Sequence, residues 1–188
     1  MPHLTPHTLS SAPQRSRPHL EAVEKSLGFI PNLFATLAES PATLEGYLAL
    51  DGAYGRGALS AAERQLVLIA ASTENDCGYC VAAHSTIAGL VKVPPAILAA
   101  VRNEEQVSDP KLEALVRLTR ALVRERGRVP ESDIEAFLRA GYDQEQLLEV
   151  IVGVGLKTIA NYVNHIAETP LDPAFAGQEW RKGALTPR

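Results

Sequence analysis

The chain has 188 residues, a formal net charge of −4, 46% apolar residues and 21% charged residues. These values are typical of a globular protein with one domain and a sizeable core. The negative balance gives no general attraction to phosphate backbones or anionic membranes, so we expect no nucleic-acid or membrane partner. No apolar run approaches the ~20 residues of a spanning helix. The N-terminus lacks the basic and apolar regions of a signal peptide. We therefore expect a cytoplasmic protein.

The first third of the chain changes from an irregular segment to helical patterns. Residues 1–19 contain four prolines and little apolar periodicity, which indicates an irregular N-terminal arm. From His19 onward the spacing of apolar residues is helical. Ser60 and Glu63 then have the spacing of a capping box, directly before an apolar run at residues 66–71. That run alone would also suit a buried strand, but the capping box favours a helix.

The same cap chemistry recurs in the second half of the chain. The predicted caps are Asp109-Pro110, Ser132 with Glu135, and Asp143 with Gln146. No convincing strand accompanies them. We therefore predict an all-α fold, a helical bundle over residues 20–175 that is followed by a tail over residues 176–188.

The last predicted helix, residues 144–168, is apolar on most of its sides. Such a helix is expected to be buried, either centrally or in a subunit interface. Gly153 and Gly155 lower its helix propensity, which indicates that another backbone approaches closely there. Its polar residues are Asn161, Tyr162, Asn164 and His165. Structural hydrogen bonds between helices are the favoured role for this polar cluster, ahead of a direct role in catalysis.

Both cysteines of the chain lie between Glu74 and His84, in the pattern E-x-x-C-x-x-C-x-x-x-H. On a helix, the four functional side chains of this pattern would fall within an arc of about 120°. Asp76 is a good cap residue, so a new helix is expected to start at Cys77. Cys77 and Cys80 would then occupy the first turn, where the helix dipole lowers the pKa of a thiol.

These groups suit thiol redox chemistry, for which we expect no cofactor. A thiolate attacks one oxygen of a peroxide while an acid protonates the other. The sulfenic acid that results condenses with a second thiol to form a disulfide. His84 lies one turn beyond Cys80 and is a candidate base. Glu74 is a candidate for moving a proton.

Two other uses of these residues stay open, and a thioredoxin-like interpretation is poor because no second convincing strand accompanies residues 66–71. Glu74, Cys77, Cys80 and His84, with His165 from the last helix, could form a zinc site or a redox sensor. Structural zinc, however, usually takes ligands from two separate elements. The thiols could also be two small buried hydrophobic groups beside a core histidine. A thioredoxin-like protein would require a strand at residues 66–71.

The pattern resembles that of the AhpD-like alkylhydroperoxidases within the carboxymuconolactone decarboxylase superfamily, and most closely their peroxidase-related branch. The resemblance extends to Leu-Gly-Phe-Ile-Pro-Asn-Leu at residues 27–33, Asn-Tyr-Val-Asn-His at 161–165 and Thr-Pro-Leu-Asp at 169–172. It implies an all-helical fold and homo-oligomers, often trimers or hexamers. It also implies an antioxidant peroxidase or disulfide reductase that is served by a dithiol or protein reductant.

The resemblance further implies a role for each site residue. The second cysteine of the motif attacks and the first resolves, which makes Cys80 peroxidatic and Cys77 resolving. His84 matches the histidine of the family.

Two positions depart from AhpD proper. Gln65 stands where AhpD has its relay glutamate, so Glu74 would have to take that role. Tyr79 stands where AhpD has a histidine. The decarboxylases of the superfamily act without this cysteine pair, and a lactone decarboxylase remains the alternative within the superfamily.

Overall fold

The computed structural model describes residues 3–184, and within them every regular element is a helix. The α-helices are α1 (Arg17–Leu27), α2 (Asn32–Leu37), α3 (Pro41–Tyr54), α4 (Ala61–Glu74), α5 (Gly78–Leu90), α6 (Pro95–Arg102), α7 (Pro110–Arg124), α8 (Glu131–Arg139) and α9 (Gln144–Ala167). A short 3₁₀ helix, η1 (Pro173–Gln178), follows. The predicted all-α fold is therefore confirmed. The apolar run at residues 66–71 lies within α4, which removes the thioredoxin-like interpretation.

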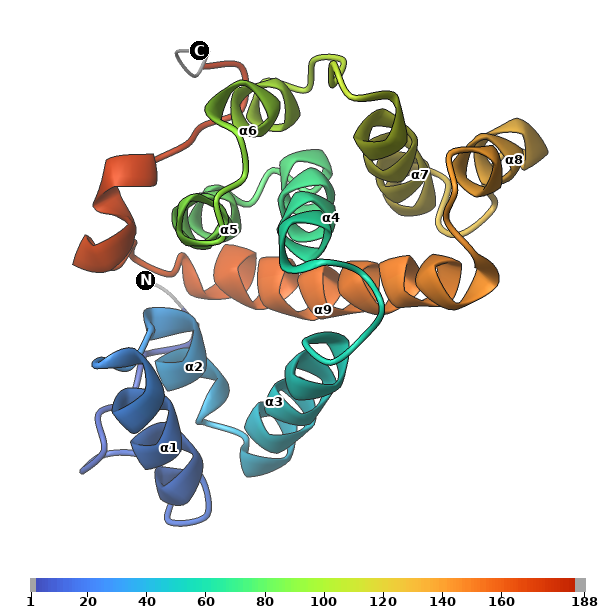
Figure 1. Cartoon of the computed structure of the whole chain (residues 1–188). Coiled ribbons are helices and arrows are strands. Elements are labelled where there is room, and N and C mark those ends of the chain that lie inside the picture. Colours follow the sequence, from blue (N-terminus) through green and yellow to red (C-terminus); the bar gives the residue numbers. More distant parts are fainter. Residues whose placement is uncertain (1–2, 185–188) are drawn as a thin grey trace.

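The longest helix, α9, crosses the whole molecule and separates two groups of helices (Figure 1). On one side it contacts α4, α5 and α7, and on the other it contacts α2 and α3. Around this centre α4 also packs against α5, α6 and α7, and α8 packs on α7. Side chains of α9 therefore pack against both groups of helices.

Several helix starts follow the predicted cap chemistry. Ser60 and Glu63 form the expected capping box at α4, and Asp143 forms another with Gln146 at α9. Asp109 accepts hydrogen bonds from two backbone N–H groups at the start of α7. The prediction for Ser132 is wrong, because α8 already begins at residue 131 and has no side-chain cap.

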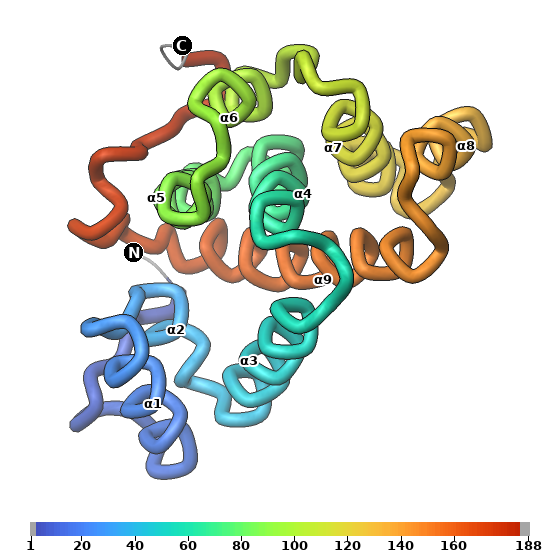
Figure 2. The backbone as a smooth tube through the Cα atoms, in the orientation of Figure 1, coloured from blue at the N-terminus to red at the C-terminus, as the bar shows by residue number. Residues whose placement is uncertain are grey.

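The described segments before α1 and after α9 both pack against the bundle. In the N-terminal arm, His7 N donates to Ala35 O at 3.0 Å and the Ser16 hydroxyl donates to Ala38 O at 2.7 Å. The arm is shorter than predicted, since α1 already begins at residue 17. The C-terminal tail runs from α9 past α5 and α6 (Figure 2). There the buried Trp180 donates from Nε1 to Arg102 O at 2.9 Å.

One side of α9 is buried within the bundle and the other is exposed in the single chain, so the predicted burial in a subunit interface stays a prediction for the exposed side. Five large apolar residues form an exposed stripe along it: Leu148, Ile151, Ile159, Tyr162 and Ile166. Among the described helices, α9 alone is long and apolar enough to match a membrane span in length and composition. Its contacts with five other helices make it the core helix of this bundle.

The two glycines of α9 have different environments. A Cβ atom on Gly153 would lie 2.7 Å from Val67 Cγ1 and 2.8 Å from Tyr54 Oη. The close approach at Gly153 thus comes from buried side chains of α3 and α4, and not from a backbone as predicted. A Cβ atom on Gly155 would meet nothing within 4 Å.

Alanine at these two positions should therefore have opposite effects. Gly153→Ala should lower the free energy of unfolding by about 1–3 kcal/mol, because two packed side chains must shift. Gly155→Ala should raise it by roughly 0.5–1 kcal/mol, the ordinary gain from replacing glycine inside a helix. Urea denaturation measures both changes. Equal effects of the two substitutions would contradict the packing described here.

Candidate functional site

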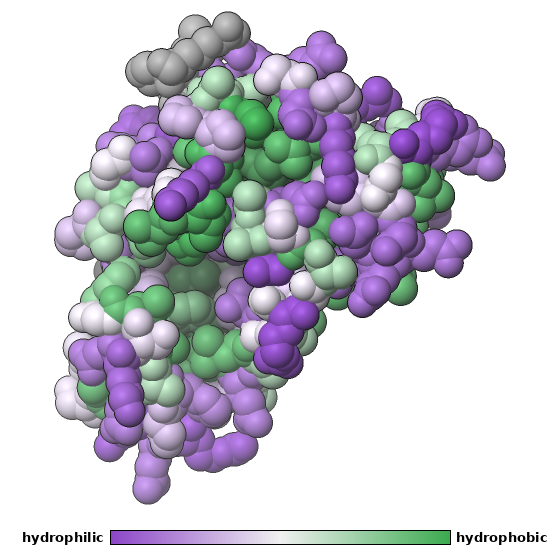
Figure 3. Space-filling model, in the orientation of Figure 1, coloured by the Kyte–Doolittle hydropathy of each residue, from purple (hydrophilic) through white to green (hydrophobic). Residues whose placement is uncertain are grey.

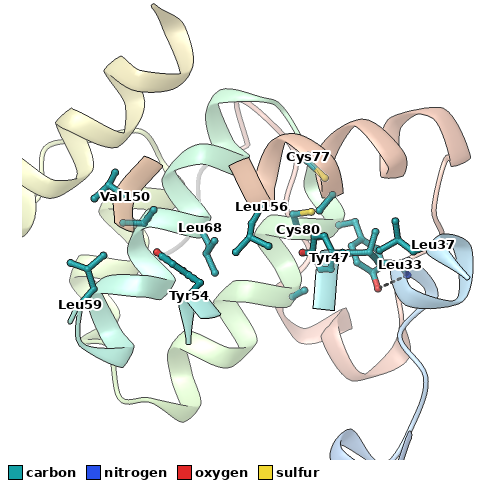
Figure 4. Packing of buried hydrophobic residues seen from close by; sticks show 14 of the residues in the cluster. Leu33, Leu37, Tyr47, Tyr54, Leu59, Leu68, Cys77, Cys80, Val150 and Leu156 are labelled. Carbon is teal, nitrogen blue, oxygen red and sulfur yellow. Dashed lines mark hydrogen bonds between the residues drawn. The ribbon is translucent and has the colours of Figure 1, made fainter. Parts of the chain in front are cut away.

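The two thiols lie side by side at the N-terminus of α5, inside the core (Figure 4). Cys77 is the N-cap of this helix and Cys80 lies in its first turn. Asp76 was expected to cap α5, but it does not. It adopts a left-handed conformation with φ of 56°, and its carbonyl oxygen is 3.3 Å from His165 Nε2. Both thiols are free and buried, and the helix N-terminus favours negative charge on them.

The amide of Asn164, on α9, contacts both sulfur atoms. Its Nδ2 lies 3.2 Å from Cys80 Sγ and 3.8 Å from Cys77 Sγ. Asn161 lies one turn earlier, where its Nδ2 donates to Ser72 Oγ at 3.3 Å and its Oδ1 accepts from Asn75 Nδ2 at 2.9 Å. The inward half of the predicted polar cluster therefore reaches the thiols, whereas Tyr162 is exposed.

A chain of polar contacts continues from His84 on α5. Gln65 Oε1 lies 3.0 Å from His84 Nδ1, and Lys157 Nζ lies 2.6 Å from His84 Nε2. An ammonium group donates and does not accept hydrogen bonds, so Nε2 must accept from Lys157. The proton of the imidazole then sits on Nδ1 and is donated to Gln65. Lys157 Nζ also lies 3.4 Å from Tyr47 Oη.

These contacts set the protonation states of the site. Burial raises the pKa of Cys80, but hydrogen bonding from Cys77, the charge of Lys157 and the Asn164 amide together lower it below the usual value of a thiol. The hydrogen bond to Cys80, together with burial, raises the pKa of Cys77. Burial and the charge of Lys157 lower the pKa of His84, so the imidazole is neutral. Cys80 is therefore the more acidic thiol of the pair, and Cys77 is the less acidic one.

A cavity of about 410 Å³ opens onto Cys80 but not onto Cys77. Its walls are mainly apolar side chains from α1, α2, α3, α5 and η1: Val23, Leu27, Leu33, Phe34, Leu48, Ile87 and Phe175. Polar groups are fewer, and they include Tyr47, Asp51, His84 and Lys157. Figure 3 shows a hollow on this face of the molecule, where apolar atoms gather between α5 and the N-terminal helices. The cavity suits an apolar molecule whose reactive end meets Cys80.

Glu74 does not join this group. It ends α4, and its carboxylate is paired with Arg124 at 2.6 Å and with Arg120 at 3.7 Å. The prediction that it shares a helix face with the thiols and His84 is wrong, because a turn separates the two helices. Among the described residues, no three carboxylate, thiol or imidazole side chains come together as a metal-binding group would require. The geometry therefore gives the zinc interpretation no support.

The two departures from AhpD both have clear partners. Gln65 holds His84, as described above. The Tyr79 hydroxyl donates to Asp172 Oδ2 at 2.5 Å, and both Asp172 oxygens accept from Asn32 N at 3.2 Å. These bonds join the start of α2 and the tail to the residue next to Cys80. The segments that carry the resemblance therefore meet at Tyr79 and Cys80.

Sequence reasoning missed Lys157, Tyr47 and the contact of Gln65 with His84. A sequence signal existed for Lys157, since it is the only charged residue between Glu149 and Glu168 in an otherwise apolar helix. Nothing in the sequence placed Tyr47 beside it, because α3 and α9 are far apart along the chain.

Comparison with known proteins gives one family and several related folds. The model of the carboxymuconolactone decarboxylase family matches residues 39–121, which include both cysteines and His84. No match was found among curated proteins.

Three solved structures illustrate the likeness. The AhpD core of an uncharacterized peroxidase-related protein from Ralstonia eutropha JMP134 has a TM-score of 0.80 and 25% identity, over 89% of this chain and 90% of that one. An uncharacterized peroxidase-related protein from Silicibacter sp. TM1040 has a TM-score of 0.80 and 20% identity, over 94% and 96% of the two chains. The debrominase Bmp8 C82A, in complex with 2,3,4-tribromopyrrole, has a TM-score of 0.79 and 18% identity, over 94% and 95%.

The thiol pair should show its asymmetry in alkylation. In the reduced protein, iodoacetamide should label Cys80 before Cys77, with a rate midpoint at least one pH unit below the ~8.5 of a free thiol. Asn164→Leu should raise that midpoint because it removes a donor to the thiolate, whereas Tyr162→Leu, on the exposed side of the same helix, should not. Peptide mass spectrometry identifies the labelled site. Faster labelling of Cys77 would contradict the assignment.

Proposed function

Because this chain belongs to the AhpD/carboxymuconolactone decarboxylase superfamily, we propose that it is a thiol-based peroxidase that reduces organic hydroperoxides. In this proposal Cys80 is the attacking thiolate and Cys77 is the resolving thiol. The observation that supports it best is the position of Cys80, which lines the cavity while the Asn164 amide contacts its sulfur at 3.2 Å and the Cys77 thiol lies next to it.

The chemistry proceeds in three balanced steps. The Cys80 thiolate attacks the terminal oxygen of the hydroperoxide, the O–O bond breaks, and the other oxygen leaves as an alcohol after it takes up a proton. Cys80 is thereby oxidised to a sulfenic acid. The Cys77 sulfur then forms a disulfide with Cys80 and the hydroxyl group leaves as water, with the proton of the Cys77 thiol. A dithiol, free or on a protein, reduces the disulfide by exchange and is itself oxidised.

The shape of the cavity supports an organic substrate over hydrogen peroxide. Its volume is far larger than hydrogen peroxide needs, and its walls are mainly apolar. Burial of an alkyl or aryl group there contributes roughly 25 cal/mol per Å² of apolar surface. Reduction by thiols also requires a reducing environment, which agrees with the expected cytoplasmic location.

Reductive removal of a halogen is a second candidate, and the apolar cavity is the feature that favours it. The Cys80 thiolate would take the halogen from carbon, the carbon would take up a proton, and Cys77 would release halide as the disulfide forms. The same thiol pair serves both reactions. The fold shared with the debrominase Bmp8 makes brominated pyrroles suitable test compounds.

We also propose that copies of this chain associate through the exposed stripe of α9. Its residues recur at steps of three and four, or multiples of these, so they lie on one face of the helix. A contiguous apolar face of this kind is uncommon on monomers, and a second copy offers the same surface in return.

Turnover assays test the peroxidase proposal directly. With dithiothreitol as donor, the protein should reduce cumene hydroperoxide with a kcat/KM at least tenfold above that for hydrogen peroxide. Cys80→Ser should abolish turnover, because the attacking atom is lost. Cys77→Ser should consume about one equivalent of peroxide and stop as a sulfenic acid, which dimedone traps.

Other outcomes would indicate other functions. Full peroxide turnover in Cys80→Ser would contradict the mechanism. Absence of peroxide turnover in the wild type, together with decarboxylation of a lactone that Cys80→Ser performs equally well, would favour a lactone decarboxylase, for which the thiols are dispensable. A single oxidation of the wild type that no dithiol converts to turnover would favour a redox sensor. Release of bromide from tribromopyrrole, without peroxide turnover, would favour dehalogenation.

One charged side chain in the exposed stripe of α9 should weaken the association of copies of this chain. Tyr162→Glu should lower the molar mass that light scattering reports, because the carboxylate would be desolvated between apolar faces. Leu90→Glu places the same charge on an exposed leucine at the end of α5 and should leave the mass unchanged. An identical mass for the wild type and Tyr162→Glu would contradict association through this stripe.

A further inference from the structure

A buried lysine lines the same cavity as the proposed attacking thiol. Only 1% of the surface of Lys157 is exposed. Its Nζ contacts two acceptors, His84 Nε2 at 2.6 Å and Tyr47 Oη at 3.4 Å. A buried ammonium group is costly unless an opposite charge compensates it. The site must therefore supply a negative charge close to Lys157.

The groups that face Lys157 come from α3 and α5. They are Tyr47 and Asp51 on α3, and Cys80 and His84 on α5, and all of them line the cavity with Lys157. Burial raises the pKa of Tyr47 and lowers the pKa of His84, so both are neutral. The acidic groups that face Lys157 are the Cys80 thiol and the Asp51 carboxyl. Burial raises the pKa of Asp51, whereas the pKa of Cys80 is lowered, so Cys80 is the partner favoured to carry the negative charge. Burial lowers the pKa of Lys157. Tyr47, Cys80 and Asp51 raise it by more than burial lowers it, so the net pKa is raised and the ammonium stays charged.

The two residues expected to move the proton are both engaged elsewhere. The lone pair of His84 Nε2 accepts from Lys157, and the other ring nitrogen bonds Gln65. The Glu74 carboxylate is paired with two arginines. The leaving oxygen of a hydroperoxide carries a developing negative charge. The Lys157 ammonium on the cavity wall is positively charged and carries protons, so it attracts this oxygen and can protonate it.

We propose that Lys157 is a catalytic residue that holds Cys80 as the thiolate and donates the proton taken up by the leaving oxygen of the substrate. This inference rests on the proposed function, in which Cys80 attacks a hydroperoxide. It assigns His84 and Gln65 a positioning role, since they fix the direction of the Lys157 side chain. Lys157 thereby takes the proton-transfer role that the relay glutamate has in AhpD, where this chain has Gln65.

The proton balance closes over a full cycle. When Cys80 attacks, the leaving oxygen takes a proton from Lys157, which becomes a neutral amine as Cys80 becomes a neutral sulfenic acid. Disulfide formation releases water and leaves the amine unchanged. Reduction by a dithiol restores the Cys77 thiol and the Cys80 thiolate, and the remaining proton of the dithiol returns to Lys157. The ammonium and the thiolate are thus discharged together and restored together.

Three substitutions separate the two parts of this role. Lys157→Met keeps most of the length of the side chain but removes the charge. The alkylation midpoint of Cys80 should then rise to 8.5 or above, and the alkylation rate at pH 7 should fall about tenfold or more. Lys157→Arg keeps the charge but is a very weak acid. Its midpoint should stay low, while its single-turnover rate with cumene hydroperoxide should fall by a factor of about 100. Lys25→Met, on the exposed face of α1, is the matched control and should behave as the wild type.

Each result decides one part of the proposal. If Lys157→Met folds and its Cys80 alkylation midpoint equals that of the wild type, Lys157 does not stabilise the thiolate. If Lys157→Arg reduces cumene hydroperoxide at the wild-type rate, Lys157 does not donate the proton. Circular dichroism and thermal melting establish folding, and Lys157→Gln replaces the methionine variant if that does not fold. Alkylation uses no peroxide, so a wild type with a low midpoint but no turnover would refute the peroxidase function while the test of the thiolate still stands.

Discussion

The burial of one ammonium group in the same site as one acidic thiol is the constraint on which the rest of the structure depends. In a site that excludes most water, opposite charges attract far more strongly than at a surface, and an unpaired charge is correspondingly costly. The Lys157 ammonium and the Cys80 thiolate would each be unfavourable in the interior without the other charge. Together they stabilise a thiolate in the core, where the backbone dipole at the start of α5 and the Asn164 amide add to the effect.

This constraint explains why α9 is the centre of the fold. Lys157, Asn161 and Asn164 all point inward from it, at steps of three and four residues, so one face of α9 lines the thiol site. The same helix must pass close to α3 and α4, and Gly153 allows that approach. The tail that follows α9 then returns over α5, where Asp172 joins Tyr79 to the start of α2. The cavity is thus enclosed by segments from both ends of the chain.

The sequence predicted the fold well because helix boundaries depend on local chemistry. The capping boxes at Ser60 and Asp143 involve residues three apart, so their spacing could be read directly. Local rules failed where backbone geometry took over. Asp76 had the right side chain for a cap, but it occupies a left-handed turn and Cys77 takes that position. Ser132 likewise had the right spacing, but α8 had already begun after a proline.

The site was predicted only in part, for a related reason. Cys77, Cys80 and His84 share one short segment, so their proximity followed from spacing alone. Glu74 had the same spacing, but the turn between α4 and α5 directs it to Arg124. Lys157, Tyr47 and Asn164 come from other helices, and their contacts depend on how α3 and α9 cross α5. That information lies in the tertiary packing, which no pattern within a single segment encodes.

Intact-protein and peptide mass spectrometry, before and after one equivalent of organic hydroperoxide, test the central claim most directly. The account predicts the loss of two hydrogen atoms, localised to a disulfide between Cys77 and Cys80, and full recovery of the original mass with a dithiol. An unchanged mass, or added oxygen on other residues with both thiols still free, would contradict it.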